Sequence, residues 1–162
     1  MKKQLKVPGF KKKDLKIPRI KDGTVIDHIT PGYAVKVLHI LCIPKNNSSS
    51  IVSVAMNVNS KMGKKDIVKV ENRELKSNEV DKISLICPKA TINIIRDYDV
   101  AKKFKVKLPD EIIGIVSCSN PTCISNAKEP VKTRFKVISK DPPRIKCYYC
   151  EREPEDIAER II

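Results

Sequence analysis

Four cysteines in the last third of the sequence constrain the fold more than any other feature. They form two short-spaced pairs, CSNPTC at Cys118 and Cys123 and CYYC at Cys147 and Cys150. Two such pairs, each on a tight turn, can place four thiolates at the corners of a tetrahedron, the geometry of a closed structural zinc site. The pattern therefore predicts one structural Zn²⁺ ion per chain, with buried or disulfide-linked thiols as the alternative. Since sulfur would fill all four positions, none remains for an activated water.

The residues around these cysteines have the pattern of short strands with little apolar core. VKTRFKVI, at 131–138, alternates in the way of a half-exposed strand. A β-unit of this size folds poorly without a metal or a partner. We therefore expect residues 105–162 to form a small all-β zinc-binding domain. The other two cysteines, Cys42 and Cys87, lie at the ends of predicted apolar helices and are expected in the core.

The charge of the chain is unevenly distributed. Its net charge is +14, from 33 Lys and Arg against 19 Asp and Glu. Residues 1–22 carry nine basic residues against two acidic ones, residues 23–109 carry fifteen against eight, and residues 110–162 carry nine of each. A zinc-ribbon protein that binds nucleic acid is the alternative function. The neutral zinc segment disfavours it, because such binding depends on cationic contacts to phosphates, and the chain has no Trp to stack on bases.

The sequence shows no sign of membrane insertion or export. No stretch reaches the roughly 18 apolar residues of a membrane helix, and the start, MKKQLKVPGFKKK, has no apolar segment after its lysines. We predict a cytoplasmic protein, since thiols stay reduced in that compartment. Residues 1–16 are Lys-rich and interrupted by Pro8 and Gly9, so they are predicted to form a mobile basic arm.

Residues 17–104 have the hydrophobic periodicity of alternating strands and helices. Strands are predicted over 23–29, 51–58, 66–72 and 91–100, with helices after the first and third of them. The first helix is predicted to have Thr30 as its cap and Pro31 at its first position, and the second, over 77–87, to be capped by Ser77 or Asn78. The order β-α-β-β-α-β predicts an α+β, ferredoxin-like domain with both helices on one face of an antiparallel sheet.

A domain boundary is expected near residues 101–110, where AKKFKVKLPDE becomes strongly charged. The predicted organisation is therefore a basic arm over 1–16, a ferredoxin-like domain over 17–104 and a zinc domain over 105–162.

The first predicted strand contains an adjacent acid and imidazole, Asp27 and His28. Neighbouring residues of a strand point to opposite faces, so we expect the two side chains not to share a proton. An independent enzyme built on this pair is disfavoured, because the sequence offers no second acid, nucleophile or open metal site to support it. Lys65 and Lys69 fall on one face of the third strand, with Lys103 beyond the fourth. Grouped ammonium groups suit phosphate recognition, and a solvated basic face is the alternative.

Several strings taken together resemble the regulatory chain of aspartate carbamoyltransferase. They are GTVIDHI, KMGKKDIVKVEN, ATINIIRDYDV, CSNPTCIS and KCYYCE, in that order between about Ile17 and Glu153. The resemblance implies a chain without activity of its own, whose amino-terminal domain binds CTP, ATP and UTP. It also implies that the zinc domain docks onto the catalytic chain, and that three regulatory dimers join two catalytic trimers.

The resemblance also assigns roles to particular residues. It implies that Asp27 and Lys69 bind the ribose hydroxyls, and that His28 and Lys103 contact the phosphates. The base would be read by backbone groups near Ile20 and Tyr98. The remaining pocket residues would be Ile17, Lys65, Asn93, Ile95 and Val100, and Asn120 with Thr122 would contact the catalytic chain. The chain departs from the better-known bacterial members in its Lys-rich extension before Leu15, in Arg19 in place of a small residue beside the pocket, and in NPT between the first two cysteines.

Overall fold

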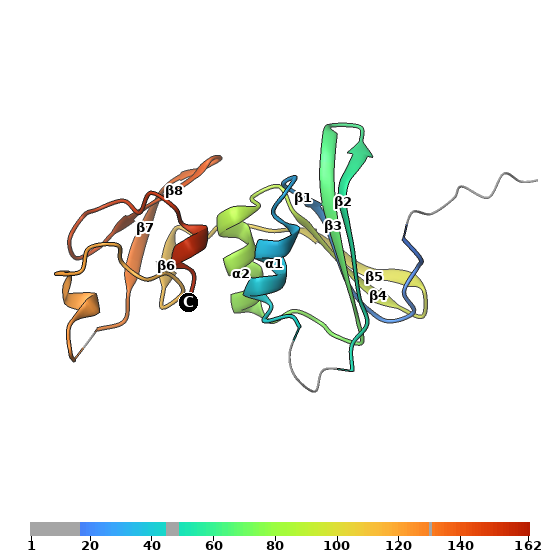
Figure 1. The fold of residues 1–162 in the computed structure, drawn as a ribbon, viewed down its shortest axis with the longest axis horizontal. Coiled ribbons are helices and arrows are strands. Elements are labelled where there is room, and N and C mark those ends of the chain that lie inside the picture. The colour runs from blue at the N-terminus through green and yellow to red at the C-terminus, as the bar shows by residue number, and fades with distance from the viewer. Residues whose placement is uncertain (1–16, 45–48, 130) are drawn as a thin grey trace, which may run out of the picture.

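The computed structural model describes residues 17–44, 49–129 and 131–162, and in these ranges the chain forms two antiparallel sheets (Figure 1). The larger sheet has the strand order β2-β3-β1-β4-β5 and the smaller one β6-β7-β8. The elements of the first part are β1 Gly23–Ile29, α1 Ala34–Ile40, β2 Val52–Ser60, β3 Gly63–Glu71, α2 Ser77–Ile86, β4 Thr91–Arg96 and β5 Asp99–Lys105. Those of the second part are β6 Glu111–Ile113, η1 Ile124–Asn126, β7 Arg134–Lys140, β8 Pro143–Cys147 and η2 Ala158–Arg160. The predicted basic arm, 1–16, falls outside the described residues.

The first four strands and two helices have the predicted ferredoxin-like arrangement. Helices α1 and α2 cover one face of the five-stranded sheet and lie between it and the C-terminal part (Figure 1). Ile26, Val68 and Ile92 from the strands and Val37 and Ile83 from the helices are fully buried in the layer between them. The α+β prediction, with a small all-β part after the ferredoxin-like part, is confirmed.

The prediction of a single strand over 91–100 is wrong. The strand ends at Arg96, the chain turns at Asp97 and Tyr98, and β5 returns beside β4 as far as Lys105. Both turn residues have positive φ, 49° and 68°, as a two-residue hairpin turn requires, although neither is glycine. Residues 101–105 were predicted to lie beyond the regular strands and helices, but they belong to β5, an edge strand of the sheet. Exposed lysines on an edge strand hinder its pairing with other chains.

The predicted start of the first helix is also wrong, because α1 begins at Ala34 and the residues before it form a turn in which the Tyr33 N–H donates to the Thr30 carbonyl. The buried carboxyl of Asp66, on β3, accepts hydrogen bonds from the backbone N–H groups of Gly32 at 2.8 Å and Ala34 at 3.2 Å. Its other oxygen accepts the N–H of Asn57 in β2 at 2.8 Å. A side chain far away in sequence thus serves as the cap of α1.

Helix α2 begins with Ser77, and Lys76 occupies the capping position predicted for Ser77 or Asn78. The Glu79 carboxylate folds back to accept the N–H of Lys76 at 2.8 Å, as in a capping box, and also pairs with Arg73. With seven residues in α1 and ten in α2, no helix among the described residues is long and apolar enough to cross a membrane.

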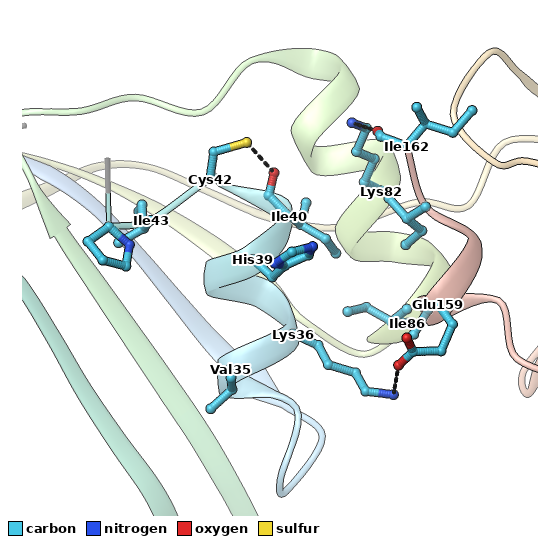
Figure 2. Close-up of a pocket in the computed structure, with 13 residues that line it drawn as sticks. Val35, Lys36, His39, Ile40, Cys42, Ile43, Lys82, Ile86, Glu159 and Ile162 are labelled. Carbon is cyan, nitrogen blue, oxygen red and sulfur yellow. Dashed lines mark hydrogen bonds and ion pairs between the residues drawn. The ribbon is translucent and has the colours of Figure 1, made fainter. Parts of the chain in front are cut away.

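The C-terminal segment joins the two parts of the molecule. Its backbone pairs with residues 115–117 through Ser117 N–H to Arg160 O and Ile162 N–H to Ile115 O, both at 2.8 Å. Figure 2 shows Lys36 of α1 reaching Glu159, at 3.7 Å, and Lys82 of α2 donating to the Ile162 carbonyl. A cleft of about 770 Å³ lies between α1, α2 and this segment. The apolar cluster is also continuous across the junction, because Ile112 and Phe135 belong to the same cluster as Ile26.

We expect Asp66→Ala to lower the free energy of unfolding by about 3 kcal/mol or more, because it leaves three backbone N–H groups without their acceptor. Urea unfolding of the zinc-loaded chain would measure the change. Asp99→Ala, on the exposed edge strand, is the matched control and should change stability by less than about 0.5 kcal/mol. Equal losses in the two variants would contradict the role given to Asp66.

Candidate functional site

Two groups of residues could carry function, and the first is the cysteine cluster. Cys118 and Cys123 lie on the loop between β6 and β7, Cys147 ends β8 and Cys150 lies in the turn after it. The four sulfur atoms all lie within 4.8 Å of one another, with Cys118 to Cys150 at 3.5 Å and Cys123 to Cys147 at 3.8 Å. A tetrahedron with zinc–sulfur bonds of about 2.3 Å requires sulfurs about 3.8 Å apart. The cluster therefore fits one zinc ion held by four thiolates.

Hydrogen bonds around the cluster hold the first cysteine loop in shape. The Ser125 hydroxyl donates to the Cys123 sulfur at 3.2 Å, and the Asn126 amide donates to the carbonyls of Cys118 at 3.0 Å and Asn120 at 2.7 Å. The Asn120 side chain is buried, and its Oδ1 accepts from both the backbone and the hydroxyl of Thr122. Such contacts orient metal ligands before the ion arrives.

The environment of the thiols is uneven. Burial raises the pKa of Cys118 to about 12, and burial also raises the pKa of Cys147. Burial acts the same way on Cys150, but hydrogen bonds from the Arg152 backbone and from the side chains of Asn120, Cys118 and Cys147 lower its pKa to about 7. The cluster thus holds one thiol, Cys150, whose pKa is lowered beside two, Cys118 and Cys147, whose pKa values are raised. A dication that binds all four must displace their protons.

The alternative of disulfide-linked thiols does not hold, since all six cysteines are free. Cys87 is buried, as predicted for a core residue, and burial raises the pKa of its thiol. The same prediction is wrong for Cys42, which is exposed. It follows the last turn of the short α1 and has a φ of 53°.

The second group of residues lies on the face of the five-stranded sheet opposite the helices. One straight row crosses four strands: Lys69 on β3 is in register with Val25 on β1, Val25 with Asn93 on β4, and Asn93 with Lys103 on β5. The Asn93 amide donates to the Val25 carbonyl at 3.3 Å. The alternation of strand side chains places these residues together on one face, because their neighbours Ile26, Val68 and Ile92 point into the core.

Asp27 and His28 lie closer together than strand alternation predicts, although their side chains form no hydrogen bond, as expected. The pairing of β1 with β3 shifts register between Ile26 and Ile29, and His28 at this bulge has a φ of 57°. The bulge brings His28 Nδ1 to 3.6 Å from the Asp27 carboxylate. The backbone N–H of His28 donates a hydrogen bond to the same carboxylate at 2.7 Å. The carboxylate also binds the Lys65 ammonium at 2.8 Å. Strand alternation fails at a bulge, because the extra residue rotates the following side chain.

The remaining predicted residues gather at one end of this face. The Lys69 ammonium donates to the carbonyls of Pro18 at 2.7 Å and Ile17 at 3.4 Å, so Lys69 holds the segment before β1 and is not paired with Asp27. Ile20, in the same segment, is buried. Tyr98 forms the tip of the β4–β5 hairpin, and its N–H donates to Lys21 O at 2.8 Å. Val100 is in register with Ile95 just behind the tip.

The sequence prediction missed a basic groove of about 570 Å³ beside His28. Its lining includes Lys64, Lys65, Lys89, Thr91 and Lys105. His28 lines this groove, and its Nδ1 atom is buried without a hydrogen-bond partner among the described residues. Lys105 lies two residues beyond Lys103 on β5, so a strand prediction over 99–105 would have placed both lysines on the same face.

Comparison with known proteins decides the family. The family model described as aspartate carbamoyltransferase regulatory chain, allosteric domain, matches residues 15–107, and the one described as its metal binding domain matches residues 110–158. The chain belongs to the aspartate carbamoyltransferase regulatory chain family. The resemblance seen in the sequence is therefore confirmed, and the metal binding domain contains all four clustered cysteines.

Curated relatives with the name aspartate carbamoyltransferase regulatory chain match over most of the sequence. The protein of Methanothermobacter thermautotrophicus is 56% identical over 140 residues, which cover 86% of this chain and 88% of the relative. That of Methanothrix thermoacetophila is 53% identical over 152 residues, covering 93% and 98%. That of Thermococcus onnurineus is 52% identical over 144 residues, covering 88% and 94%.

Metal analysis of the purified chain should give about one zinc per chain. Removal of the metal with a chelator should unfold the second part of the molecule, because four protonated or repelling thiols at these distances cannot replace the bonds to the ion. The loss of dispersed amide resonances from β6, β7 and β8 in a two-dimensional NMR spectrum would report this. A fully folded, metal-free second part would contradict the assignment of the four cysteines.

Proposed function

We propose that this chain is a non-catalytic allosteric subunit of aspartate carbamoyltransferase. It binds the nucleoside triphosphates CTP, ATP and UTP on the outer face of the five-stranded sheet. Its zinc-bearing part docks onto the catalytic chain, and dimers of it link catalytic trimers. The observation that carries the proposal is a cluster of cations on this face: Lys65 binds Asp27 at 2.8 Å, His28 lies beside Asp27, and Lys69 and Lys103 lie in the neighbouring row of the sheet.

The chemistry of this face suits a nucleotide. A triphosphate is a polyanion, and each hydrogen bond to a charged group contributes roughly 1.5–3 kcal/mol. His28 and Lys103, with Lys105 beyond them, provide donors for phosphate oxygens. Asp27 offers acceptors for ribose hydroxyls and keeps its orientation through Lys65. Backbone groups at Ile20 and Tyr98, beside the exposed Val100, provide the end at which a base would lie.

We propose that the chain has no activity of its own. A zinc ion held by four thiolates has no open position for a water or a substrate, so it supports folding and docking. Asp27 is engaged by Lys65 and by the His28 backbone, which is the arrangement of a binding group. We keep the predicted cytoplasmic location as part of this proposal, because zinc-binding thiols need a reducing compartment.

The exposed apolar side chains suggest where partners attach. Ile113, Ile124 and Tyr148 of the zinc-bearing part are each more than half exposed, at 52%, 54% and 57%. Their surroundings are electrically neutral overall, as suits a protein interface. Val54 and Met56 are exposed on β2, an edge strand of the larger sheet, and this edge is our candidate for contact between two regulatory chains.

Lys69→Ala and Lys103→Ala should each weaken nucleotide binding about tenfold, because each removes one charged donor from the site. Isothermal titration calorimetry of the full chain with ATP and CTP would measure the affinities. Lys128→Ala, an exposed change of equal charge on the zinc-bearing part, is the control and should bind as the unaltered chain does. Unchanged binding in both test variants would place the nucleotide elsewhere.

Cys118→Ser should abolish association with the catalytic trimer while leaving nucleotide binding in place. The change removes one thiolate and so unfolds a part that depends on its metal, whereas β1 to β5 keep their own two-helix core. Size-exclusion chromatography with the catalytic trimer tests the loss of association, and calorimetry with ATP tests the retained nucleotide binding. Retained complex formation would show that the zinc-bearing part is not the docking surface.

A further inference from the structure

Arg19 makes an unusual contact at the end of the sheet face where the base is proposed to lie. Its guanidinium Nη2 donates to the Tyr98 carbonyl at 2.6 Å, across a sequence separation of 79 residues. Both side chains are exposed, and Tyr98 is the tip of the β4–β5 hairpin. Together with the bond from Tyr98 N–H to Lys21 O at 2.8 Å, this contact ties the segment before β1 to the hairpin.

The contact changes the hydrogen-bonding character of this end of the site. A carbonyl oxygen is an acceptor, so an open Tyr98 carbonyl would suit an exocyclic amino group of a base. A guanidinium has five N–H donors and no acceptor. One of these N–H groups binds the Tyr98 carbonyl, so that acceptor is already shared and the other N–H groups belong to the same guanidinium. The positive charge of Arg19 also acts on Lys69. Burial is the larger cause that lowers the pKa of Lys69, and the charge of Arg19 is the second.

We infer that Arg19 is a specificity-determining residue that favours nucleotides whose base has a keto oxygen over those with an amino group at the same ring position. This inference rests on the nucleotide site proposed above. Uracil and cytosine differ in this way at position 4, and hypoxanthine and adenine at position 6, so one donor reads both pairs. An amino group meeting the guanidinium brings two donors together, whereas a keto oxygen accepts from it.

The two matched pairs of nucleotides provide the test. We would titrate the full regulatory chain with UTP and CTP, and with ITP and ATP, by isothermal titration calorimetry. Arg19→Ala removes the donor and leaves the Tyr98 carbonyl to the base. We expect UTP and ITP to bind more weakly and CTP and ATP more tightly, with the keto-to-amino affinity ratio falling about tenfold in each pair, the size of one charged hydrogen bond.

Lys21→Ala is the matched control, because it removes the same charge two residues away and leaves the contact between Arg19 and Tyr98. It should change all four affinities by one common factor. If Arg19→Ala also changes all four equally, or changes none, Arg19 does not read the base and the inference is overturned while the nucleotide site stands. If the unaltered chain binds none of the four nucleotides, the proposed site fails and the inference fails with it.

Discussion

The buried carboxyl of Asp66 is the interaction on which the rest of the structure depends. Its two oxygens accept N–H groups from the turn before α1, from the first residue of α1 and from β2. It thereby fixes a helix, an edge strand and the central part of the sheet to one another. Its neighbour Lys65 points the other way and binds Asp27 on the outer face. One strand, β3, therefore anchors the helix layer through Asp66 and the proposed nucleotide site through Lys65, so a shift of β3 would disturb both.

Much of this arrangement could be predicted from the sequence, because it follows from local alternation. In β3, Asp66, Val68 and Val70 are buried while Lys65 and Lys69 are partly exposed, which is the period-two pattern of a strand with one core face. The spacing of the four cysteines likewise predicted their cluster. In the first case the signal is local, and in the second it lies in two short-spaced pairs that the metal chemistry brings together.

The failures share a different physical cause. The cap of α1 comes from Asp66, more than thirty positions away, so no local pattern around Thr30 could reveal it. The hairpin at Asp97 and Tyr98 and the bulge at His28 place residues other than glycine at positive φ, against their ordinary preference. Tertiary pairing enforces these conformations. The hairpin turn and the bulge lie at the two ends of the proposed nucleotide site. Backbone with positive φ there changes the direction of a side chain or exposes a carbonyl group.

In the proposed function, the helices offer one route for a signal from the nucleotide to the zinc-bearing part, because α1 and α2 lie between the two (Figure 1). The ion pair between Lys36 and Glu159 is too exposed to carry much of it, since such pairs are worth about 0–1 kcal/mol. Ile157, Ala158 and Ile161 instead pack against the cluster that also contains the helix residues. Coupling between sites is typically about 1–3 kcal/mol, which is the scale of a few partly buried apolar side chains. A nucleotide acts only through a difference in affinity between two states. The apolar packing of the C-terminal segment is therefore one place where two such states could differ.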